Sequence, residues 1–382
     1  MVSKSEFYVA GIMSGTSLDG VDIALCHFLR SDRGWIFSIK KAKTYPYPDV
    51  WKKQLVGAET SSGIDLMLLH KAYGAYLGEL TLGFLKGEER PDFISSHGHT
   101  IFHQPARRLT FQLGDGASIA ATTGITTISD FRSLDVALGG QGAPLVPVGD
   151  ELLFGEYDQC LNLGGFANIS VNENGFRKAF DICPVNIVLN HLSSKYLGAE
   201  YDKDGERGRN GTLNTHLLDK LNRLDYFRQA PPKSLGKEWV LEYMMPLIEA
   251  ASVSIEDKLR TVYENIAIQL SSVINSLHGM RVLVTGGGAY NKFLLELLQT
   301  KTKRQVIVPE REVVDFKEAL IFAFLGVLKF LDQFKLLAFL SFKFLRVLCN
   351  SVYKFYFGVN RAIGIKKRPL SCFHIAHIVS SP

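Results

Sequence analysis

The chain has 382 residues, more than one hydrophobic core usually holds, so we expect two domains with a cleft between them. Its five cysteines are scattered and include no C-x-x-C pair, which excludes a zinc ribbon or thiol-exchange site and is typical of a cytoplasmic protein. The formal net charge is +5, but the segment from Gln333 onward has eight Lys or Arg and no acidic residue, so the remainder carries −3 and is not expected to bind nucleic acid.

A hairpin with a long glycine-rich turn is predicted at the start of the chain. Phe7–Ala10 and Val21–Phe28 contain β-branched and aromatic residues, and they flank the sequence GIMSGTSLDGVD at 11–22. The residues before the first strand are polar, and the apolar run is only as long as a strand and ends in glycine. We therefore expect no secretory signal and a cytoplasmic location.

Helices and strands alternate along the chain, which predicts the α/β class. Asp65–Leu85 has apolar residues at helical spacing, and Asp92–Ser95 is expected to be a short buried strand that leads into a glycine turn, SHGHT, at 96–100. Another strand is expected at Ile125–Asp130. Ile255–Leu277 has the spacing of a long amphipathic helix.

Two further predicted strands end in glycine turns. One begins the sequence CLNLGGFANI at 160–169 and the other begins VLVTGGGAYN at 282–291. A single Gly-Gly pair after a strand is often only a tight connection. Three such turns, with Thr, Ser or Asn beside them, predict phosphate or nucleotide binding, because their backbone amides point together and favour negative charge.

The first turn lacks the lysine of the P-loop and the spacing of the dinucleotide-binding fingerprint, so neither common phosphate motif applies. What remains is two hairpins and a late glycine turn, a layout that resembles the actin, hexokinase and Hsp70 superfamily. In that superfamily two hairpins grip the phosphates from opposite domains and the late turn meets the adenosine. The resemblance implies an α/β, two-domain actin/hexokinase/Hsp70-like fold with a central ATP cleft.

Within that superfamily the chain resembles the anhydro-N-acetylmuramic acid kinase family. The matching segments occur in order between about residue 7 and residue 328. They are GIMSGTSLDGVD (11–22), SHGHT (96–100), GDGASIA (114–120), DFRSLDVALGGQGAPLVP (130–147), NLGGFANIS (162–170), FDICPVN (180–186), PKSLGKEW (232–239), GGGAYN (286–291) and EALIFAFLG (318–326).

The resemblance implies that ATP, 1,6-anhydro-N-acetylmuramic acid and water give N-acetylmuramic acid 6-phosphate and ADP. One site would open the anhydro bridge and phosphorylate O6, in the recycling of a cell-wall sugar in the bacterial cytoplasm. The expected cofactors are ATP and Mg²⁺, and neither nucleic acid nor membrane is an expected partner. The sequence does not determine the oligomeric state, and a homodimer is left open.

The predicted first domain covers 1–130, the second covers 131–328, and an atypical basic and apolar tail covers 329–382. The tail has eight phenylalanines from Phe330 onward and does not resemble the end of the family. Its apolar runs are too short to span a bilayer, and a basic amphipathic helix at a membrane surface is the alternative. We favour the hypothesis that a reading-frame shift has replaced the true end, which translation of the alternative frames would test.

Asp181 is the predicted catalytic base. It is expected to follow a strand at Arg177–Phe180 and to take a proton from the water that attacks C1 while O6 attacks the γ-phosphate. The alternative is an aspartate that caps a helix before Pro184. The family more often has Asp-Thr-Gly-Pro-Gly-Asn here, whereas this chain keeps only the Asp, the Pro and Asn186.

The predicted nucleotide-binding residues lie in the three glycine turns, because phosphoryl transfer depends mainly on positioning and charge neutralisation. Asp19 or Asp22 is also expected to hold Mg²⁺ through water, although either could instead cap the hairpin turn. The full predicted set is Gly15, Thr16, Ser17, Leu18, Asp19, Gly20, Val21, Asp22, Gly164, Gly165, Asn168, Gly286, Gly287, Gly288 and Asn291.

Three residues are predicted to bind the sugar. Arg132 would pair with the lactyl carboxylate, with a surface salt bridge to a nearby aspartate as the alternative. His97 would bond to sugar hydroxyls, with a structural histidine as the alternative. The resemblance makes Glu318 a ligand of the sugar hydroxyls from the second domain, although a carboxylate that opens an apolar helix also suits the helix dipole.

Two other groups of polar residues could suggest a binding site, but the sequence around them does not support one. His97, His99 and His103 lack a carboxylate or cysteine to complete a zinc site. Lys233 and Lys237 are expected to be solvated, although the family motif is retained around them.

Two other function classes are alternatives to the sugar kinase. A non-catalytic or inactive nucleotide-binding member of the same superfamily would lack the set formed by Asp181, Arg132 and Glu318. A glycosidase that does not use ATP would leave the three glycine turns unexplained.

Overall fold

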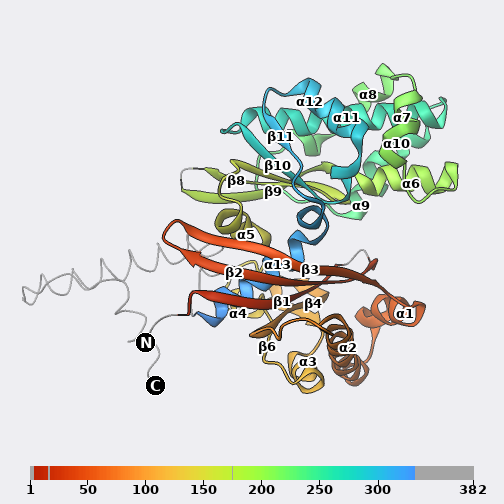
Figure 1. The fold of residues 1–382 in the computed structure, drawn as a ribbon. Helices are drawn as coiled ribbons and strands as arrows, with labels where there is room; N and C mark the ends of the chain where they lie inside the picture. Colours follow the sequence, from red (N-terminus) through yellow and green to blue (C-terminus); the bar gives the residue numbers. More distant parts are fainter. Residues whose placement is uncertain (1–3, 16–17, 174, 332–382) are drawn as a thin grey trace, which may run out of the picture.

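The computed structural model describes residues 4–15, 18–173 and 175–331 of the chain. Each half of the described chain contains one β-sheet with helices packed on it (Figure 1). The predicted α/β class is confirmed. The tail from residue 332 onward lies outside the described residues, and so does the hypothesis about its origin.

The first sheet forms from strands that all precede residue 130. They are β1 (Glu6–Ser14), β2 (Gly20–Ser31), β3 (Gly34–Pro46), β4 (Phe93–Gln104), β5 (Leu109–Leu113) and β6 (Thr127–Ile128). Their order is β3-β2-β1-β4-β5, with β6 also pairing with β4. The first three strands are antiparallel and β4 runs parallel to β1. The hairpin predicted at the start of the chain is therefore β1 and β2.

The second sheet repeats the central arrangement of the first. Its strands are β7 (Gln159–Leu163), β8 (Phe166–Glu173), β9 (Phe176–Pro184), β10 (Arg281–Thr285) and β11 (Gln305–Ile307). Their order is β11-β10-β7-β8-β9. Again the first three strands are antiparallel and the fourth runs parallel to the first.

The helices connect and cover these strands. Ahead of the second sheet in the chain they are α1 (Asp49–Gly57), α2 (Gly63–Phe84), α3 (Gly116–Thr123), α4 (Ser133–Ala137) and α5 (Val146–Leu153). They continue with α6 (Asn186–Leu197), α7 (Glu206–Asn210), α8 (Thr215–Asn222), α9 (Lys237–Trp239), α10 (Met245–Glu249), α11 (Ile255–Ser276), α12 (Lys292–Lys301) and α13 (Arg311–Phe330). Single turns of 3₁₀-helix lie at η1 (Ala58–Thr60), η2 (Pro105–Arg107), η3 (Lys203–Gly205), η4 (Asp225–Arg228) and η6 (Gly287–Tyr290), and a π-helical turn at η5 (Val240–Met244).

Strand β1 is buried between two helices, which explains its continuous apolar sequence. Phe7 and Val9 belong to the core shared with α13, whereas Ala10 and Ile12 belong to the core shared with α2. Gly11 lets α13 approach closely, because a Cβ at this position would lie 2.1 Å from the carbonyl oxygen of Ala319. The first glycine of the GIMSGTS sequence therefore serves helix packing.

Helix α13 and helix α5 lie between the two sheets (Figure 1). The side chains of 319–325, 327 and 328 are buried, and α13 packs mainly on β1, β2 and β4 while also contacting β10. We placed this helix in the second domain, but it packs on the first sheet because that sheet offers an apolar face. The boundary at 130/131 itself stays a prediction.

Two predicted elements differ in length from the observed ones. The sequence SHGHT at 96–100 was expected to form a turn, but it lies inside β4, because Gly98 adopts φ +75° and the strand continues past this irregularity. The strand expected at 125–130 shortens to Thr127–Ile128, and Asp130 adopts φ +55° in the loop that follows.

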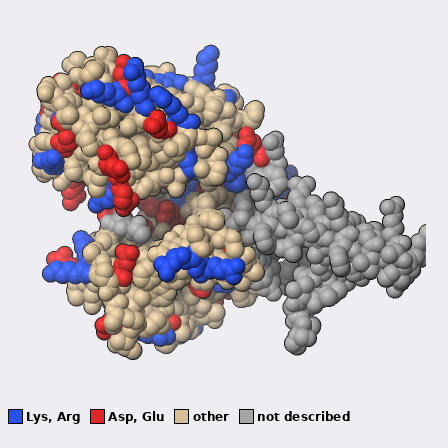
Figure 2. All heavy atoms as spheres, turned by 180° about the vertical axis from the view of Figure 1, so that it is seen from behind, with Lys and Arg blue, Asp and Glu red and all other residues tan. Residues whose placement is uncertain are grey.

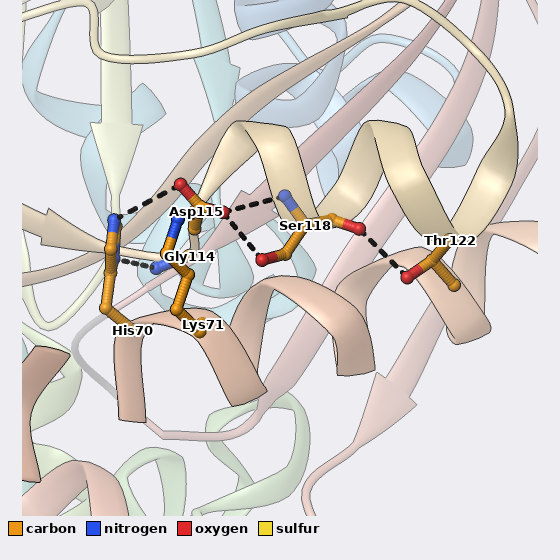
Figure 3. Close-up of polar contacts among 6 residues, drawn as sticks. All are labelled: His70, Lys71, Gly114, Asp115, Ser118 and Thr122. Atoms are coloured by element: carbon orange, nitrogen blue, oxygen red, sulfur yellow. Dashed lines mark hydrogen bonds and ion pairs between the residues drawn. The ribbon is translucent and has the colours of Figure 1, made fainter. Parts of the chain in front are cut away.

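The GDGASIA sequence joins α3 to α2 (Figure 3). Asp115 caps α3, since its Oδ2 accepts hydrogen bonds from the backbone N–H of Ser118 at 2.7 Å and from the Ser118 hydroxyl at 2.6 Å. Lys71 of α2 lies 2.9 Å from the same oxygen, and Gly114 N–H donates to Nδ1 of His70 at 3.0 Å. Burial raises the pKa of Asp115, but the Ser118 and Lys71 contacts outweigh it and set that pKa to about 2. Asp115 of this segment therefore serves as the N-cap of α3.

Candidate active site

The first hairpin turn connects the end of β1 to the start of β2. Gly15 accepts a hydrogen bond from the backbone N–H of Leu18 at 3.4 Å, and Leu18 adopts φ +61°. Asp19 is exposed. Thr16 and Ser17 lie outside the described residues. Gly20, Val21 and Asp22 form the start of β2, so they are strand residues and not part of the turn.

A buried network of hydroxyls lies beneath this turn. The Ser14 hydroxyl lies 2.6 Å from the Tyr47 hydroxyl and 3.0 Å from Nδ1 of His99, and it accepts a hydrogen bond from the Tyr73 hydroxyl at 2.9 Å. Burial lowers the pKa of His99 to about 4, so its imidazole is neutral near pH 7. The network fixes the last residue of β1 and therefore the point where the turn begins.

Several carboxylates gather beside β2 and α13. Asp22 accepts a hydrogen bond from the Thr44 hydroxyl at 2.5 Å. Burial raises the pKa of Asp22, and the negative charges of Asp315 and Asp19 raise it further. Glu318 is exposed. Even so, the surrounding protein partly desolvates its carboxylate and raises its pKa, and the negative charge of Asp22 raises the pKa further.

Glu318 was expected to open a helix, and α13 in fact begins earlier, at Arg311. The helix is kinked at Phe316, which has φ −118° and ψ 15°. Glu318 therefore lies two residues after an interruption, at the start of the apolar part of the helix. The sequence identified this second segment, and the kink is why its start does not coincide with the start of α13.

Arg132 and His97 form a pair next to Glu318. Arg132 Nε donates to Nε2 of His97 at 3.1 Å, and His97 Nδ1 lies 2.9 Å from the carbonyl oxygen of Gly98. Since Nε2 accepts, the proton of the neutral ring is on Nδ1. Burial and the Arg132 charge lower the pKa of His97 to about 3. Both ring nitrogens of His97 are therefore used inside the protein.

The Arg132 guanidinium is held by the loop that follows it. Its NH1 donates to the carbonyl oxygen of Gly142 at 2.6 Å. Asp135 shapes that loop by accepting from Gly142 N–H at 2.6 Å, and Asp130 accepts from Ser133 N–H at 3.1 Å. Burial lowers the pKa of Arg132 to about 10, and Glu318 opposes this shift. Within the described part of the chain, no ion pair joins Arg132 to either aspartate, so the salt-bridge alternative is wrong.

The second hairpin places three polar residues in one row across the sheet. Asn162 of β7 is opposite Asn168 of β8, and Asn168 is opposite Asp181 of β9. Directly opposed residues in antiparallel strands share a face. The pairing shifts by one residue at Ile182, and such bulges redirect neighbouring side chains.

The late glycine turn packs against the same hairpin. Gly286 adopts φ +81°, and a Cβ there would lie 2.5 Å from Oδ1 of Asn162. A Cβ at Gly288 would lie 2.7 Å from Cβ of Leu163. Gly287 is exposed, and Asn291 caps α12 by accepting from the backbone N–H of Leu294 at 3.0 Å. The turns at Gly164–Gly165 and at 286–288 are therefore adjacent.

Asp181 lies within β9, whereas the sequence predicted that it would come just after a strand. Helix α6 begins at Asn186 with Val185 at its N-cap position, so the helix-cap alternative for Asp181 is wrong. Its Oδ2 accepts a hydrogen bond from the backbone N–H of Leu235 at 2.9 Å. Burial raises the pKa of Asp181, and this hydrogen bond offsets the shift only in part.

The structure also contains polar groups that sequence reasoning missed. Lys317 Nζ lies 2.7 Å from Oδ1 of Asp150, and both residues are buried. Tyr290 donates to Oδ1 of Asp315 at 2.6 Å, which connects the late glycine turn to α13. Asp150 lies in an apolar stretch of the sequence, and a charged residue inside such a stretch is a signal that could have been followed.

The two halves enclose a recess in which acidic side chains are visible (Figure 2). Among the described residues, no cluster of three or more His, Cys, Asp or Glu is close enough to bind a metal directly. In the same residues no helix combines the length and apolar character needed to cross a bilayer. His103 Nδ1 lies 3.2 Å from the Thr110 hydroxyl.

Comparisons with known proteins agree on a single family. Residues 7–334 match the family model described as anhydro-N-acetylmuramic acid kinase. A relative of that name from Hydrogenovibrio crunogenus is 35% identical over 342 residues, covering 84% of this chain and 91% of the relative. One from Vibrio cholerae is 36% identical over 345 residues, covering 85% and 92%.

Similarity to solved structures is more distant. Component A of (R)-2-hydroxyglutaryl-CoA dehydratase from Acidaminococcus fermentans aligns with a TM-score of 0.44 and 12% identity, covering 83% of this chain and 96% of that one. A ROK family glucokinase from Streptomyces griseus aligns with a TM-score of 0.39 and 11% identity, covering 83% and 98%.

Proposed function

This chain belongs to the anhydro-N-acetylmuramic acid kinase family and is a phosphotransferase, and from that premise we propose that it couples phosphorylation to hydrolytic opening of its sugar. The proposed substrate is 1,6-anhydro-N-acetylmuramic acid and the proposed donor is ATP. Water attacks C1, the C1–O6 bond breaks, O6 attacks the γ-phosphorus, and the bond to ADP breaks. The product is N-acetylmuramic acid 6-phosphate, formed in the recycling of a cell-wall sugar in the bacterial cytoplasm.

The observation that carries this proposal is the position of Asp181. It stands in the row with Asn162 and Asn168, next to the two glycine turns of the second half. One carboxylate oxygen bonds to Leu235 N–H, and no hydrogen bond within the described residues reaches the other. A carboxylate with a raised pKa and one free oxygen is suited to accept the proton of the attacking water.

We assign the first half to the sugar. Arg132 keeps N–H groups beyond those that bond to His97 and Gly142, and these would bind the lactyl carboxylate. Since both nitrogens of His97 are engaged, we propose that His97 acts on the sugar by orienting Arg132. Glu318 would accept hydrogen bonds from sugar hydroxyls, since it is exposed and interacts electrostatically with Asp22 and Arg132.

The carboxylates beside the first hairpin fit Mg²⁺ bound through water. Burial raises the pKa of Asp22, and the negative charges of Asp315 and Asp19 raise it further, a repulsion that a bound cation would relieve. Mg²⁺ usually keeps several waters and binds through one or two carboxylates together with substrate phosphates. When bound with ATP, Mg²⁺ neutralises phosphate charge.

A homodimer stays a prediction, which a measurement of the protein's mass in solution would test.

The test is an assay with the anhydro sugar, with and without Mg·ATP, in water enriched in ¹⁸O. We expect turnover only with ATP, and label in the C1 hydroxyl and not in the phosphate when the product is analysed before anomeric exchange. Turnover without ATP would support the glycosidase alternative. ATP binding without turnover would support the inactive alternative.

The matching variant is Asp181→Asn, with Asp32→Asn in the exposed β2–β3 turn as control. We expect Asp181→Asn to lose turnover by at least about 100-fold, in the range of general-base catalysis, while it still binds ATP. Wild-type rates in Asp181→Asn would contradict the assignment of the base.

A further inference from the structure

Asp181 is held by a segment far from it in the sequence. The Tyr226 hydroxyl donates to the backbone carbonyl oxygen of Asp181 at 2.8 Å. Asp181 N–H donates to the carbonyl oxygen of Lys233 at 3.1 Å, and Leu235 N–H donates to Oδ2 of Asp181 at 2.9 Å. Both backbone groups of Asp181 and one carboxylate oxygen are therefore bonded to residues 226–235.

The segment is itself fixed by Lys233. Its ammonium donates to the carbonyl oxygen of Tyr226 at 3.1 Å and lies 4.5 Å from the centre of the Tyr226 ring. Tyr226 is 4% exposed, and its ring packs at 5.4 Å from that of Trp239. Lys233 was expected to be a solvated residue, but burial lowers the pKa of its ammonium. The lysine of the PKSLGKEW sequence therefore closes the segment onto η4.

We propose that Tyr226, Lys233 and the amide of Leu235 form a clamp that positions Asp181 and leaves Oδ1 as the oxygen that takes the proton. The inference rests on the proposed role of Asp181 as the base. An N–H donor stabilises the negative charge on Oδ2, and Oδ1 has no hydrogen-bond partner in the described part of the chain. Tyr226 and Lys233 are positioning residues, since they act through the backbone of Asp181.

Besides the Leu235 N–H, three titratable side chains near Asp181 could affect its pKa. Within β9 the nearest is Cys183, whose pKa burial raises, so its thiol is neutral. From η4 it is Tyr226, whose pKa is raised by burial and then by the charge of Asp181. From the segment that follows it is Lys233. The clamp predicts that loss of the Leu235 N–H raises the pKa of Asp181, because that hydrogen bond lowers it.

The experiment compares Tyr226→Phe, which keeps the ring, with Leu235→Pro, which removes the N–H donor. We expect Tyr226→Phe to lower kcat about 10-fold at unchanged KM for both substrates, because catalysis is sensitive to small displacements of the reacting groups. Leu235→Pro should move the acid limb of the kcat/KM profile to higher pH. Tyr243→Phe, on an exposed tyrosine nearby, is the matched control and should match the wild type.

Lys233 gives a third readout that does not depend on the proline variant folding. Lys233→Met should lower kcat in the same direction as Tyr226→Phe, and Lys233→Arg should restore it, because arginine keeps a donor to the Tyr226 carbonyl. Thermal unfolding of each variant separates a loss of fold from a loss of rate.

The outcomes separate the clamp from the proposed base. If Asp181→Asn retains turnover, the base assignment fails, and the clamp fails with it. If Asp181→Asn is inactive while folded Tyr226→Phe and Lys233→Met both keep wild-type kcat, only the clamp is overturned. An unmoved acid limb in folded Leu235→Pro overturns it as well. A lowered kcat with the shifted acid limb in Leu235→Pro supports the clamp.

Discussion

The two halves of the molecule share an arrangement of strands but carry different chemistry. In each, three antiparallel strands are followed by a fourth that runs parallel to the first, and a glycine turn joins the first two strands. Carboxylates lie beside the first turn and Arg132 lies near Glu318, whereas Asn162, Asn168 and Asp181 lie beside the second turn. The same backbone topology therefore provides two turns at corresponding places, and the side chains decide what each would bind.

The halves also differ in how they are covered. Strand β1 of the first sheet is buried on both faces, by α13 and α2. Helix α13 comes from the far end of the described chain, after all strands of the second sheet. Because it also carries Glu318 and the buried Lys317, the helix that completes the first half joins it to the second. The predictions below test this division of roles, beginning with the junction.

The largest effect is expected from the buried ion pair between α13 and α5. Lys317→Met leaves the Asp150 carboxylate buried without its cation, which should cost about 3–5 kcal/mol of unfolding free energy. Lys317→Met combined with Asp150→Leu should recover part of the loss, because it removes the unpaired charge. Lys220→Met, on an exposed lysine, is the control in urea unfolding. A loss below about 1 kcal/mol, the range of surface pairs, would mean that this pair does not join the halves.

The assignment of the sugar to the first half predicts a selective loss in Arg132→Met. Loss of charged hydrogen bonds should lower kcat/KM for the sugar about 10- to 100-fold, and the Kd of ATP should stay unchanged. The matched variant in the second half is Gly286→Ala, which puts a side chain at φ +81° and 2.5 Å from Asn162. It should weaken ATP and spare the sugar. An equal loss of sugar and ATP binding in either variant would contradict the assignment of the sugar to the first half and of ATP to the second.

The neutral histidine beneath the first turn predicts a dependence of stability on pH. The pKa of His99 is lowered to about 4 in the folded protein, so the unfolded chain binds the proton more readily and stability falls as the pH drops below about 6.5. His99→Gln should remove up to about 2 kcal/mol of this loss at pH 5. Unfolding of His99→Gln and of the exposed control His216→Gln, compared at pH 7.5 and pH 5, measures it. Identical pH slopes in all three proteins would contradict it.

The smallest effect is expected at the cap of α3. Asp115→Ala should cost about 1 kcal/mol at neutral pH, because the N-cap contacts to Ser118 are lost. The folded pKa of Asp115 is lowered to about 2, so its contribution is present above the ordinary carboxylate pKa near 4 and disappears as the pH falls towards 2. Urea midpoints of wild type and Asp115→Ala should therefore converge at low pH. Asp49→Ala, which caps no helix, is the control.

Local sequence was sufficient for the elements that repeat a short-range pattern. The β1–β2 hairpin, α2 and α11 were predicted to within a few residues, because apolar spacing and turn residues determine them. It was insufficient for β4, where Gly98 suggests a turn although the strand continues through it. A glycine permits a left-handed residue, but only the neighbouring strands decide whether pairing stops there.

For the site, the sequence identified residue types and their order, and the family comparison agrees with the function inferred from them. The partners of those residues were not accessible to it. Arg132 was expected to bind the sugar, with a salt bridge to an aspartate as the alternative, and the sequence did not reveal that His97 and the Gly142 carbonyl hold it in place. Lys233 was expected to be solvated, and it packs on Tyr226 behind Asp181.

By itself, the sequence determined the fold class, the three glycine turns and the family, since these depend on patterns that are continuous along the chain. Only the tertiary structure decided that GIMSGTSLDGVD begins with a glycine that serves helix α13, and that Asp181 is held by residues 226–235. The physical reason is that burial, ion pairing and hydrogen bonding depend on which distant segments meet. Those contacts, more than the residue types, set the charges and positions on which the proposed reaction depends.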